Sequence, residues 1–100
     1  MSTALEKLFN LSRAFTDPSR LLILTALYPV PKLDFQSLKK NWRFSQGNLS
    51  GHLIKLEKSG YVKMEKTFKG KFPQTWCSLT KKGRDAIYDY AQQFKSVVDK

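Results

Sequence analysis

Apolar residues recur with a helical period in the middle of the chain. Leu49, Leu53 and Leu56 fall at i, i+4 and i+7, so they share one narrow stripe along a helix. Ser45 precedes the stripe, and its hydroxyl can accept a hydrogen bond from an unpaired N–H group of the first turn. Gly60 follows the stripe, where a left-handed glycine commonly ends a helix. The pattern predicts one helix between Ser45 and Gly60.

The face of this helix opposite the leucine stripe has no acidic residue and contains Gly47 and Gly51. Each interior glycine costs about 1 kcal/mol relative to alanine. Two glycines on an exposed face are expected where a bulky partner approaches the helix backbone. The alternative is an ordinary solvated face with poor helix formers. We favour a helix, residues 46–58, that enters a nucleic-acid groove.

Two helices are predicted nearer the N-terminus. Apolar residues line one side of residues 3–15, which indicates an amphipathic helix. Residues 20–28 are apolar on nearly every side and predict a central core helix. This helix is expected to start at Asp17-Pro18, because aspartate caps helices and proline is tolerated at the first helical position.

A short strand and a third helix are predicted next. Leu33 is expected in the strand, and Asp34 is expected to cap a helix over residues 35–42 with apolar positions at i, i+3 and i+7. Arg43-Phe44 then forms a tight corner before the central helix.

The period changes from 3.6 to 2 after the central helix. Residues 62–68 alternate between apolar and polar side chains, as in a strand. Residues 69–73 contain a glycine and a proline and predict a turn with two lysines at its tip, and residues 75–79 predict a returning strand. Thr80 is expected to cap a last amphipathic helix that runs to about Val98.

The order of these elements predicts a winged helix-turn-helix, a mostly α member of the α+β class with a three-helix core and a β-hairpin wing. Residues 1–100 are expected to form a single domain, with the helix-turn-helix over 34–59 and the wing over 61–80. The terminal helices, within residues 1–16 and 81–100, carry apolar stripes beyond what such a core needs. They are therefore expected to form a homodimer interface.

The charge distribution favours a nucleic-acid partner. The net charge is +10, and residues 31–60 and 61–84 have net charges of +4 and +6, whereas residues 1–30 and 85–100 have +1 and −1. A localised basic surface attracts phosphate and releases counterions when it binds. The alternative is a basic surface that only confers solubility.

Other function classes find little support in the sequence. There is no apolar run of about 18 residues for a membrane span and no secretory signal. The single cysteine excludes an internal disulfide and fits a reducing compartment, so a cytoplasmic protein is expected. We expect no cofactor, metal or enzymatic activity, because no catalytic constellation or phosphate loop is present and His52 is the only histidine.

The candidate DNA contacts lie on the central helix, the corner before it and the wing tip. Asn48 suits a bidentate pair with adenine, Ser50 suits several base edges, and Lys55 suits guanine or phosphate. The alternative is that all three contact only phosphate, the commoner kind of contact. The full set of candidates is Arg43, Ser45, Gln46, Asn48, Ser50, Lys55, Lys58, Lys69 and Lys71.

Four further residues are assigned to packing, and Trp76 is assigned no role. His52 lies beside the leucine stripe and is expected to pack against a neighbouring helix, and Trp42 and Phe44 are expected in the core. Cys77 is expected to be a small buried residue and not a redox switch, with Trp76 on the other face of the same strand.

Several stretches together match one known pattern. They are residues 17–21, 33–39, 47–53, 56–62, 69–75 and 79–84. In combination they resemble small prokaryotic winged-helix regulators related to the MarR and ArsR transcription factors. The resemblance implies a dimeric, cytoplasmic DNA-binding regulator, with helix 46–58 in the major groove and the basic wing, residues 68–73, on the adjacent backbone or minor groove.

The chain departs from that family at four positions. Arg43 stands where the corner usually has glycine, which indicates either an added phosphate contact or a different corner conformation. Gly51 and Ile54 stand where long polar or basic side chains are common, which leaves fewer groups to read bases. Cys77 occupies a position that is often aromatic. ArsR-type metal sensing is not carried over, because no second histidine or paired cysteine accompanies His52.

The sequence favours a sequence-specific regulator that binds double-stranded DNA. Two alternatives stay open: a winged-helix protein–protein interaction module, and a protein that binds nucleic acid without sequence preference. Only the first explains together the glycine-bearing helix face, the wing lysines and the terminal amphipathic helices. Any small-molecule effector is expected to bind at the dimer interface, because no separate ligand domain is recognised in the chain.

Overall fold

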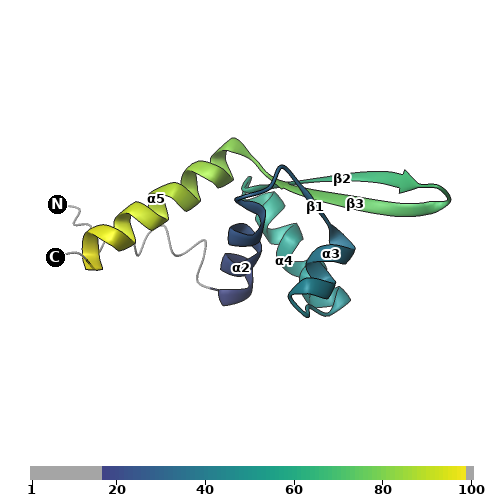
Figure 1. The fold of residues 1–100 in the computed structure, drawn as a ribbon, viewed down its shortest axis with the longest axis horizontal. Helices are drawn as coiled ribbons and strands as arrows, with labels where there is room; N and C mark the ends of the chain where they lie inside the picture. Colours follow the sequence, from purple (N-terminus) through teal and green to yellow (C-terminus); the bar gives the residue numbers. More distant parts are fainter. Residues whose placement is uncertain (1–16, 99–100) are drawn as a thin grey trace.

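The computed structural model describes residues 17–98, apart from the side chains of Gln93, Phe94 and Val97. The helix predicted over residues 3–15 lies outside the described residues. The predicted winged helix-turn-helix is confirmed, and its elements follow the expected order (Figure 1). They are α2 (Pro18–Leu27), β1 (Leu33–Asp34), α3 (Phe35–Asn41), α4 (Gln46–Lys58), β2 (Val62–Lys69), β3 (Phe72–Leu79) and α5 (Lys81–Val98).

Helices α2 and α4 begin at the predicted caps. Asp17 Oδ1 accepts a hydrogen bond from the Ser19 N–H at 2.8 Å, and Ser45 Oγ accepts one from the Asn48 N–H at 3.1 Å. Gly60 follows α4 with a φ of 82°, the left-handed conformation that favours glycine. Both ends of α4 are therefore set by the residues that the sequence places there.

The caps of α5 and α3 differ from each other. Thr80 Oγ1 accepts a hydrogen bond from the Gly83 N–H at 3.0 Å, which confirms the predicted cap of α5. Asp34 occupies the N-cap position of α3, but its carboxylate accepts a hydrogen bond from the Ser37 hydroxyl and not from a backbone N–H. Asp34 is therefore the N-cap residue of α3, as predicted, but its side chain leaves the backbone N–H groups of the first turn without a capping hydrogen bond.

One apolar core joins the helices to the base of the hairpin. The predicted core helix α2 is buried on one side only, since Leu22 is 37% exposed. Its composition suggested burial on nearly every side, but α4 and the sheet cover only part of its surface. The buried residues are Ile23, Leu24, Leu27, Leu38, Leu49, Leu53, Leu56, Val62, Cys77 and Ala86.

The three strands form an antiparallel sheet in the order β1-β3-β2. Strand β3 begins at Phe72, so the wing turn is shorter than predicted and consists of Gly70 and Lys71. Pro73 is tolerated in β3 because β1 pairs only with residues 76–77, and β3 is an edge strand at Pro73. The hairpin therefore continues well beyond the core, and Phe68 is exposed although it continues the alternation of Val62.

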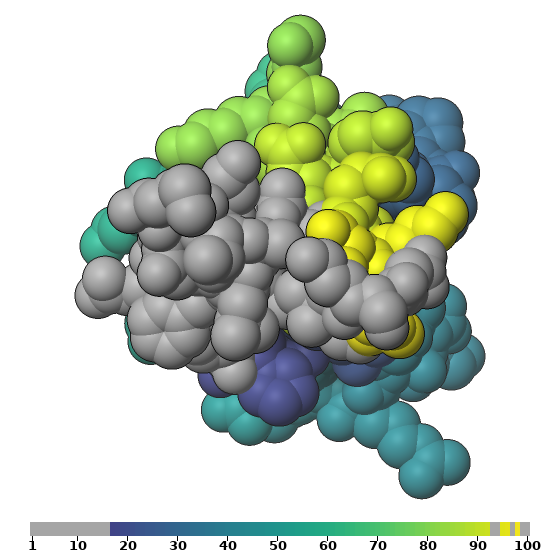
Figure 2. All heavy atoms as spheres, turned by 90° about the vertical axis from the view of Figure 1, so that its left-hand side faces the viewer, coloured from purple at the N-terminus to yellow at the C-terminus, as the bar shows by residue number. Residues whose placement is uncertain are grey.

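The wing and α5 extend from the helices in opposite directions (Figure 1). In the view turned by 90°, the described atoms of α5 lie above those of α2 and of the α3–α4 region (Figure 2). Among the described residues, no helix has the length and apolar character that a membrane span requires.

The start of α5 packs closely against the start of the wing. A Cβ added to Gly83 would lie 2.1 Å from the carbonyl oxygen of Tyr61. Gly83→Ala is therefore expected to lower the free energy of unfolding by about 1–3 kcal/mol, because the two backbones must move apart. Urea denaturation measures the change.

Gly47→Ala is the matched control for this substitution. Gly47 also lies in the first turn of a helix, but no protein atom lies within 4 Å of its added Cβ. The control is expected to leave the free energy of unfolding unchanged or to raise it by up to about 1 kcal/mol. Equal losses of stability in both variants would contradict the close contact at Gly83.

Candidate nucleic-acid interface

The outer face of α4 is set by its buried face. Leu49 and Leu53 are fully buried and Leu56 is 1% exposed, so the opposite side of the helix faces solvent. Ser50 is half-buried at the edge of that side, and Ile54 is 44% exposed. The outer face defined in this way carries Gly47, Asn48, Gly51, Lys55 and Lys58, all of them exposed, as the helical projection predicts.

Nothing in the protein requires glycine on this face. No heavy atom lies within 4 Å of a Cβ added to Gly47 or Gly51, and neither residue has a left-handed backbone. Alanine would therefore fit at both positions and would favour the helix. The two glycines leave the backbone of α4 open to a partner outside the chain.

The corner of the helix-turn-helix contains a strained residue. Arg43 has a φ of 56°, in the left-handed region that favours glycine. The chain turns there with a hydrogen bond from the Phe44 N–H to the Lys39 carbonyl at 3.0 Å. Arg43 thus takes the backbone conformation of a glycine corner while it presents an exposed guanidinium beside the start of α4.

Two lysines that the sequence analysis left out of the site lie next to this corner. Lys39 Nζ donates a hydrogen bond to Gln46 Oε1 at 3.3 Å, which joins α3 to the first residue of α4. Lys39, Lys40 and Arg43 line a shallow hollow of about 460 Å³ with Gln36 and Phe44. In the sequence, Lys39 and Lys40 could have been added to the candidate site because they lie in the predicted helix just before the corner.

Helix α4 and the wing border a common groove. Gln46, Ser50 and Ile54 line it from α4, and Lys66 and Pro73 line it from the hairpin. The groove has a volume of about 360 Å³. The structure therefore brings the predicted residues Gln46 and Ser50 next to the wing, and Lys66 lines the same groove.

The residues at the tip of the wing are exposed. Lys69 and Lys71 lie on either side of Gly70, which has a φ of 64°. A two-residue turn with glycine in first place is typical of a tight hairpin. Lys63, farther from the tip, forms an ion pair with Glu65 at 3.1 Å, which partly neutralises its charge.

His52 packs as the sequence predicts. Its ring lies edge-on to that of Phe44, with 6.4 Å between ring centres, and its Nδ1 lies 3.9 Å from Asp17 Oδ2. The backbone N–H of Ser19 is the main cause that holds the pKa of Asp17 below its usual value. His52 thus ties α4 to the ionised cap of α2.

Cys77 and Trp76 also lie away from the outer face of α4. Cys77 is fully buried, and burial raises the pKa of its thiol to about 11, so the thiol stays protonated at neutral pH. Trp76 is half-buried on the other face of β3, with Lys32 Nζ 4.4 Å from the centre of its ring. Within residues 17–98, no group of three or more His, Cys, Asp or Glu residues is arranged to hold a metal ion.

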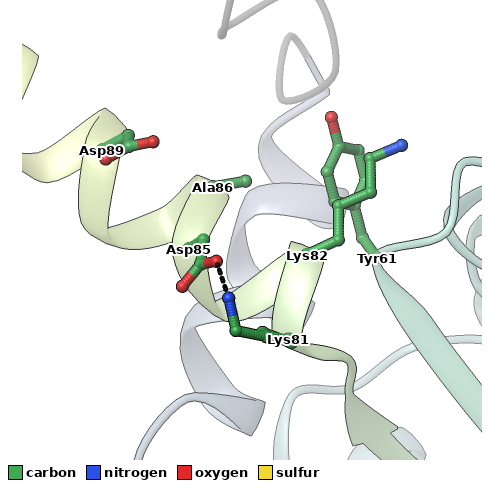
Figure 3. A pocket seen from close by; sticks show the side chains of 6 residues that line it. All are labelled: Tyr61, Lys81, Lys82, Asp85, Ala86 and Asp89. Carbon is green, nitrogen blue, oxygen red and sulfur yellow. Dashed lines mark hydrogen bonds and ion pairs between the residues drawn. The ribbon is translucent and has the colours of Figure 1, made fainter.

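Another hollow lies at the start of α5, beside Tyr61, and is lined by no residue of α4 (Figure 3). Its charged residues are largely engaged within the chain. Lys81 Nζ pairs with Asp85 Oδ2 at 3.2 Å, and Lys82 Nζ donates to the Ser59 carbonyl at 2.9 Å. The Lys82–Ser59 hydrogen bond joins α5 to the end of α4.

The comparisons with known proteins agree with this geometry. Residues 19–98 match the family described as winged helix DNA-binding domain. The chain belongs to this DNA-binding family. A relative in Methanocaldococcus jannaschii, an uncharacterized protein, is 37% identical over 79 residues, which cover 78% of this chain and 85% of the relative.

Solved structures extend the similarity to the whole winged-helix fold. A transcriptional regulator homologue from Pyrococcus horikoshii OT3 matches with a TM-score of 0.87 and 29% identity, over 96% of this chain and 94% of that chain. A MarR-family regulator from Porphyromonas gingivalis W83 shares the fold, with a TM-score of 0.70 and 21% identity over 84% of this chain and 81% of that chain. The resemblance to small prokaryotic winged-helix regulators is confirmed.

A substitution on the outer face of α4 is expected to affect the free energy of unfolding and the affinity for DNA in opposite directions. Gly51→Ala is expected to raise the free energy of unfolding by about 1 kcal/mol, because alanine is the better helix former and the space around it is open. The same methyl group is expected to weaken duplex DNA binding about tenfold, because it holds the α4 backbone away from the DNA. Urea denaturation and fluorescence anisotropy with a labelled duplex measure the two effects. A more stable variant that binds as tightly as the wild type would show that DNA does not approach this face.

Proposed function

We propose that the protein regulates transcription by binding a specific site on double-stranded DNA. In this proposal α4 lies in the major groove, and the wing contacts the adjacent backbone or minor groove. The observation that carries it is the outer face of α4, where a Cβ added to Gly47 or Gly51 would meet nothing within 4 Å beyond the adjacent residues and the helix's own backbone. A major groove about 12 Å wide admits an α-helix, and a face without bulky side chains lets the bases approach the backbone.

Asn48 is assigned the main role in reading bases. Its backbone N–H is engaged by the Ser45 cap, whereas its side chain lies on the exposed face of the first turn. An asparagine amide can pair bidentately with adenine in the major groove. Gln46 and Ser50, beside the wing groove, and Lys55, on the outer face, are assigned to neighbouring base edges or phosphates.

The other basic candidates are assigned to phosphate. Arg43 lies at the corner before α4, Lys58 in the last turn of α4, and Lys69 and Lys71 at the wing tip. Such contacts fix the orientation of a protein on DNA and release counterions. Ser45, at the N-terminus of α4, is assigned a supporting place where backbone N–H groups attract a phosphate.

We further propose that the protein acts as a homodimer through its terminal helices. Along α5, Ile87 and Tyr90 pack partly against the core, and Val98, near the end of the helix, is 60% exposed. The apolar residues of α5 therefore continue beyond the core of one chain. Two-fold pairing is the commonest way to cover such a surface, and it gives a palindromic DNA site.

One observation favours a second candidate function, nucleic-acid binding without sequence preference. Ile54 is 44% exposed beside the outer face of α4, and neither Ile54 nor Gly51 has a side-chain hydrogen-bonding group. Base reading by α4 then depends on few side chains. The experiment below distinguishes the two functions.

Helix α4 and the wing are expected to respond differently to substitution. Selection from random duplex DNA first supplies the preferred site, which is expected to be palindromic. Asn48→Ala is expected to cost about 1–3 kcal/mol at this site and to relax discrimination there. Lys69→Ala with Lys71→Ala is expected to weaken binding to every sequence alike and to lower the log–log salt slope by about two units per subunit.

Anisotropy titrations on the selected duplex and on a scrambled one, at several salt concentrations, measure both effects. The scrambled duplex is the control for sequence-independent binding. If selection yields no enriched sequence although binding occurs, the second candidate function is correct. If Asn48→Ala weakens binding to both duplexes equally, while the wing variant loses affinity only for the selected duplex, the assigned roles of α4 and the wing are reversed.

A further inference from the structure

Two phenylalanines project from the wing tip into solvent. Phe68 is 77% exposed and Phe72 is 76% exposed, whereas Trp76 on the same hairpin is half-buried. The two rings flank the Gly70-Lys71 turn, one near the end of β2 and one at the start of β3.

The two phenyl rings contribute little to the packing of the fold. Across the hairpin, Phe68 is paired with Pro73 and Phe72 with Lys69. Such cross-strand pairs stabilise a hairpin modestly, and far less than the burial of a whole phenyl ring would. The exposed area of the two side chains is therefore available to an external partner.

The pairing register relates the rings to α4. Phe68 lies on the same face of the hairpin as Met64 and Lys66, which line the groove beside α4. Phe72 lies on the opposite face, directly across from Lys69. The wing tip thus presents one phenyl ring on each face of a thin hairpin.

The tip of the hairpin extends past α4. The inner part of β2 lies beside α4, where Met64 and Lys66 line the shared groove. From Lys66 to Lys69 the strand continues for about 10 Å at about 3.3 Å per residue. With α4 in the major groove, this extension carries the tip toward the phosphate backbone that borders the adjacent minor groove.

We propose that Phe68 and Phe72, which point away from each other on opposite faces of the tip, enter this minor groove as apolar wedges at two separate base steps, unstack them and bend the duplex toward the major groove that holds α4. The inference rests on the proposed function and adds a mechanism to it. Phenylalanine side chains inserted from the minor groove kink DNA by about 20–90°. The minor groove is about 6 Å wide, which excludes a two-stranded hairpin but admits flat side chains at its tip.

Charge favours DNA over a second copy of the protein as the partner of this tip. Lys66, Lys69 and Lys71 are exposed beside the rings, and residues 66–84 contain no acidic residue. The nearest carboxylate along β2, that of Glu65, is paired with Lys63. Two wing tips would repel each other, whereas the phosphates that border a minor groove attract the lysines.

The wedge also implies a sequence preference at the edge of the site. Pyrimidine–purine steps such as TA and CA/TG are the most easily kinked. Such steps are therefore expected where the wing enters the minor groove, even though no side chain there forms base-specific hydrogen bonds.

The test is DNA bending, measured by energy transfer between dyes at the two ends of the selected duplex with saturating protein. The wild type is expected to bend the duplex by about 20° or more. Phe68→Ala with Phe72→Ala is expected to leave it nearly straight and to bind on the order of tenfold more weakly, with an unchanged salt slope. Phe68→Leu with Phe72→Leu is expected to restore the bend, because leucine also serves as a wedge.

Tyr28→Ala is the matched control, since Tyr28 is a partly exposed aromatic residue at the end of α2, 37% exposed, and is assigned neither to the wing nor to the dimer. It is expected to leave both bending and affinity unchanged. The single variants Phe68→Ala and Phe72→Ala are expected to give intermediate bends, and they keep the test decisive if the double alanine variant does not fold.

Three results would overturn the wedge. The first is a wild-type protein that binds the selected duplex without bending it. The second is a double alanine variant that bends the duplex as strongly as the wild type. The third is a double alanine variant whose mass in light scattering is smaller than that of the wild type, because the rings would then contact another protein chain. Sequence-specific binding by the wild type would leave the proposed function intact in each case. If selection yields no preferred sequence, the proposed function fails, and ring-dependent bending of random duplexes would still support the wedge.

Discussion

The rest of the structure depends on the burial of the leucine stripe of α4. Leu49, Leu53 and Leu56 lie at the centre of the core, and a fully buried leucine contributes about 1.5–3 kcal/mol. Their combined contribution outweighs the cost of about 2 kcal/mol for the two glycines of the same helix. Because the stripe faces the core, the geometry of the helix directs the glycine face outward. The open surface that we assign to DNA is thus a consequence of how the core is packed.

The elements that follow α4 are tied back to its C-terminal end. Gly60 reverses the chain there, and Thr80 Oγ1 donates a hydrogen bond to the Gly60 carbonyl at 2.6 Å. Lys82 Nζ donates to the Ser59 carbonyl, and Gly83 lets α5 approach the start of the wing. From this one junction the wing and α5 extend in opposite directions (Figure 1). These contacts fix α5 relative to α4 within one subunit. In the homodimer that we propose, the way in which the α5 helices pair therefore sets the distance between the two α4 helices.

Most of the fold could be predicted from the sequence, because local chemistry specifies it. The caps at Asp17, Ser45 and Thr80 and the helical or alternating periods depend on neighbouring residues alone. The length of the wing could not be predicted, because Pro73 is allowed in β3 only by the absence of β1 at that level. In the candidate site, the outer face of α4 followed from its period, whereas the Lys39–Gln46 contact depends on how α3 approaches α4. The exposure of Phe68 also depends on tertiary structure, since an alternating strand pattern does not show where the hairpin leaves the core.

Methylation interference on the selected duplex tests most directly whether α4 lies in the major groove. Dimethyl sulfate methylates guanine N7, which faces the major groove, and adenine N3, which faces the minor groove. We predict that N7 methylation of guanines within each half-site blocks binding of the wild-type protein, and that adenine N3 methylation blocks binding only at the flanks contacted by the wing. Binding that tolerates N7 methylation throughout the half-sites, and is blocked there by N3 methylation, would contradict the assignment of α4 to the major groove.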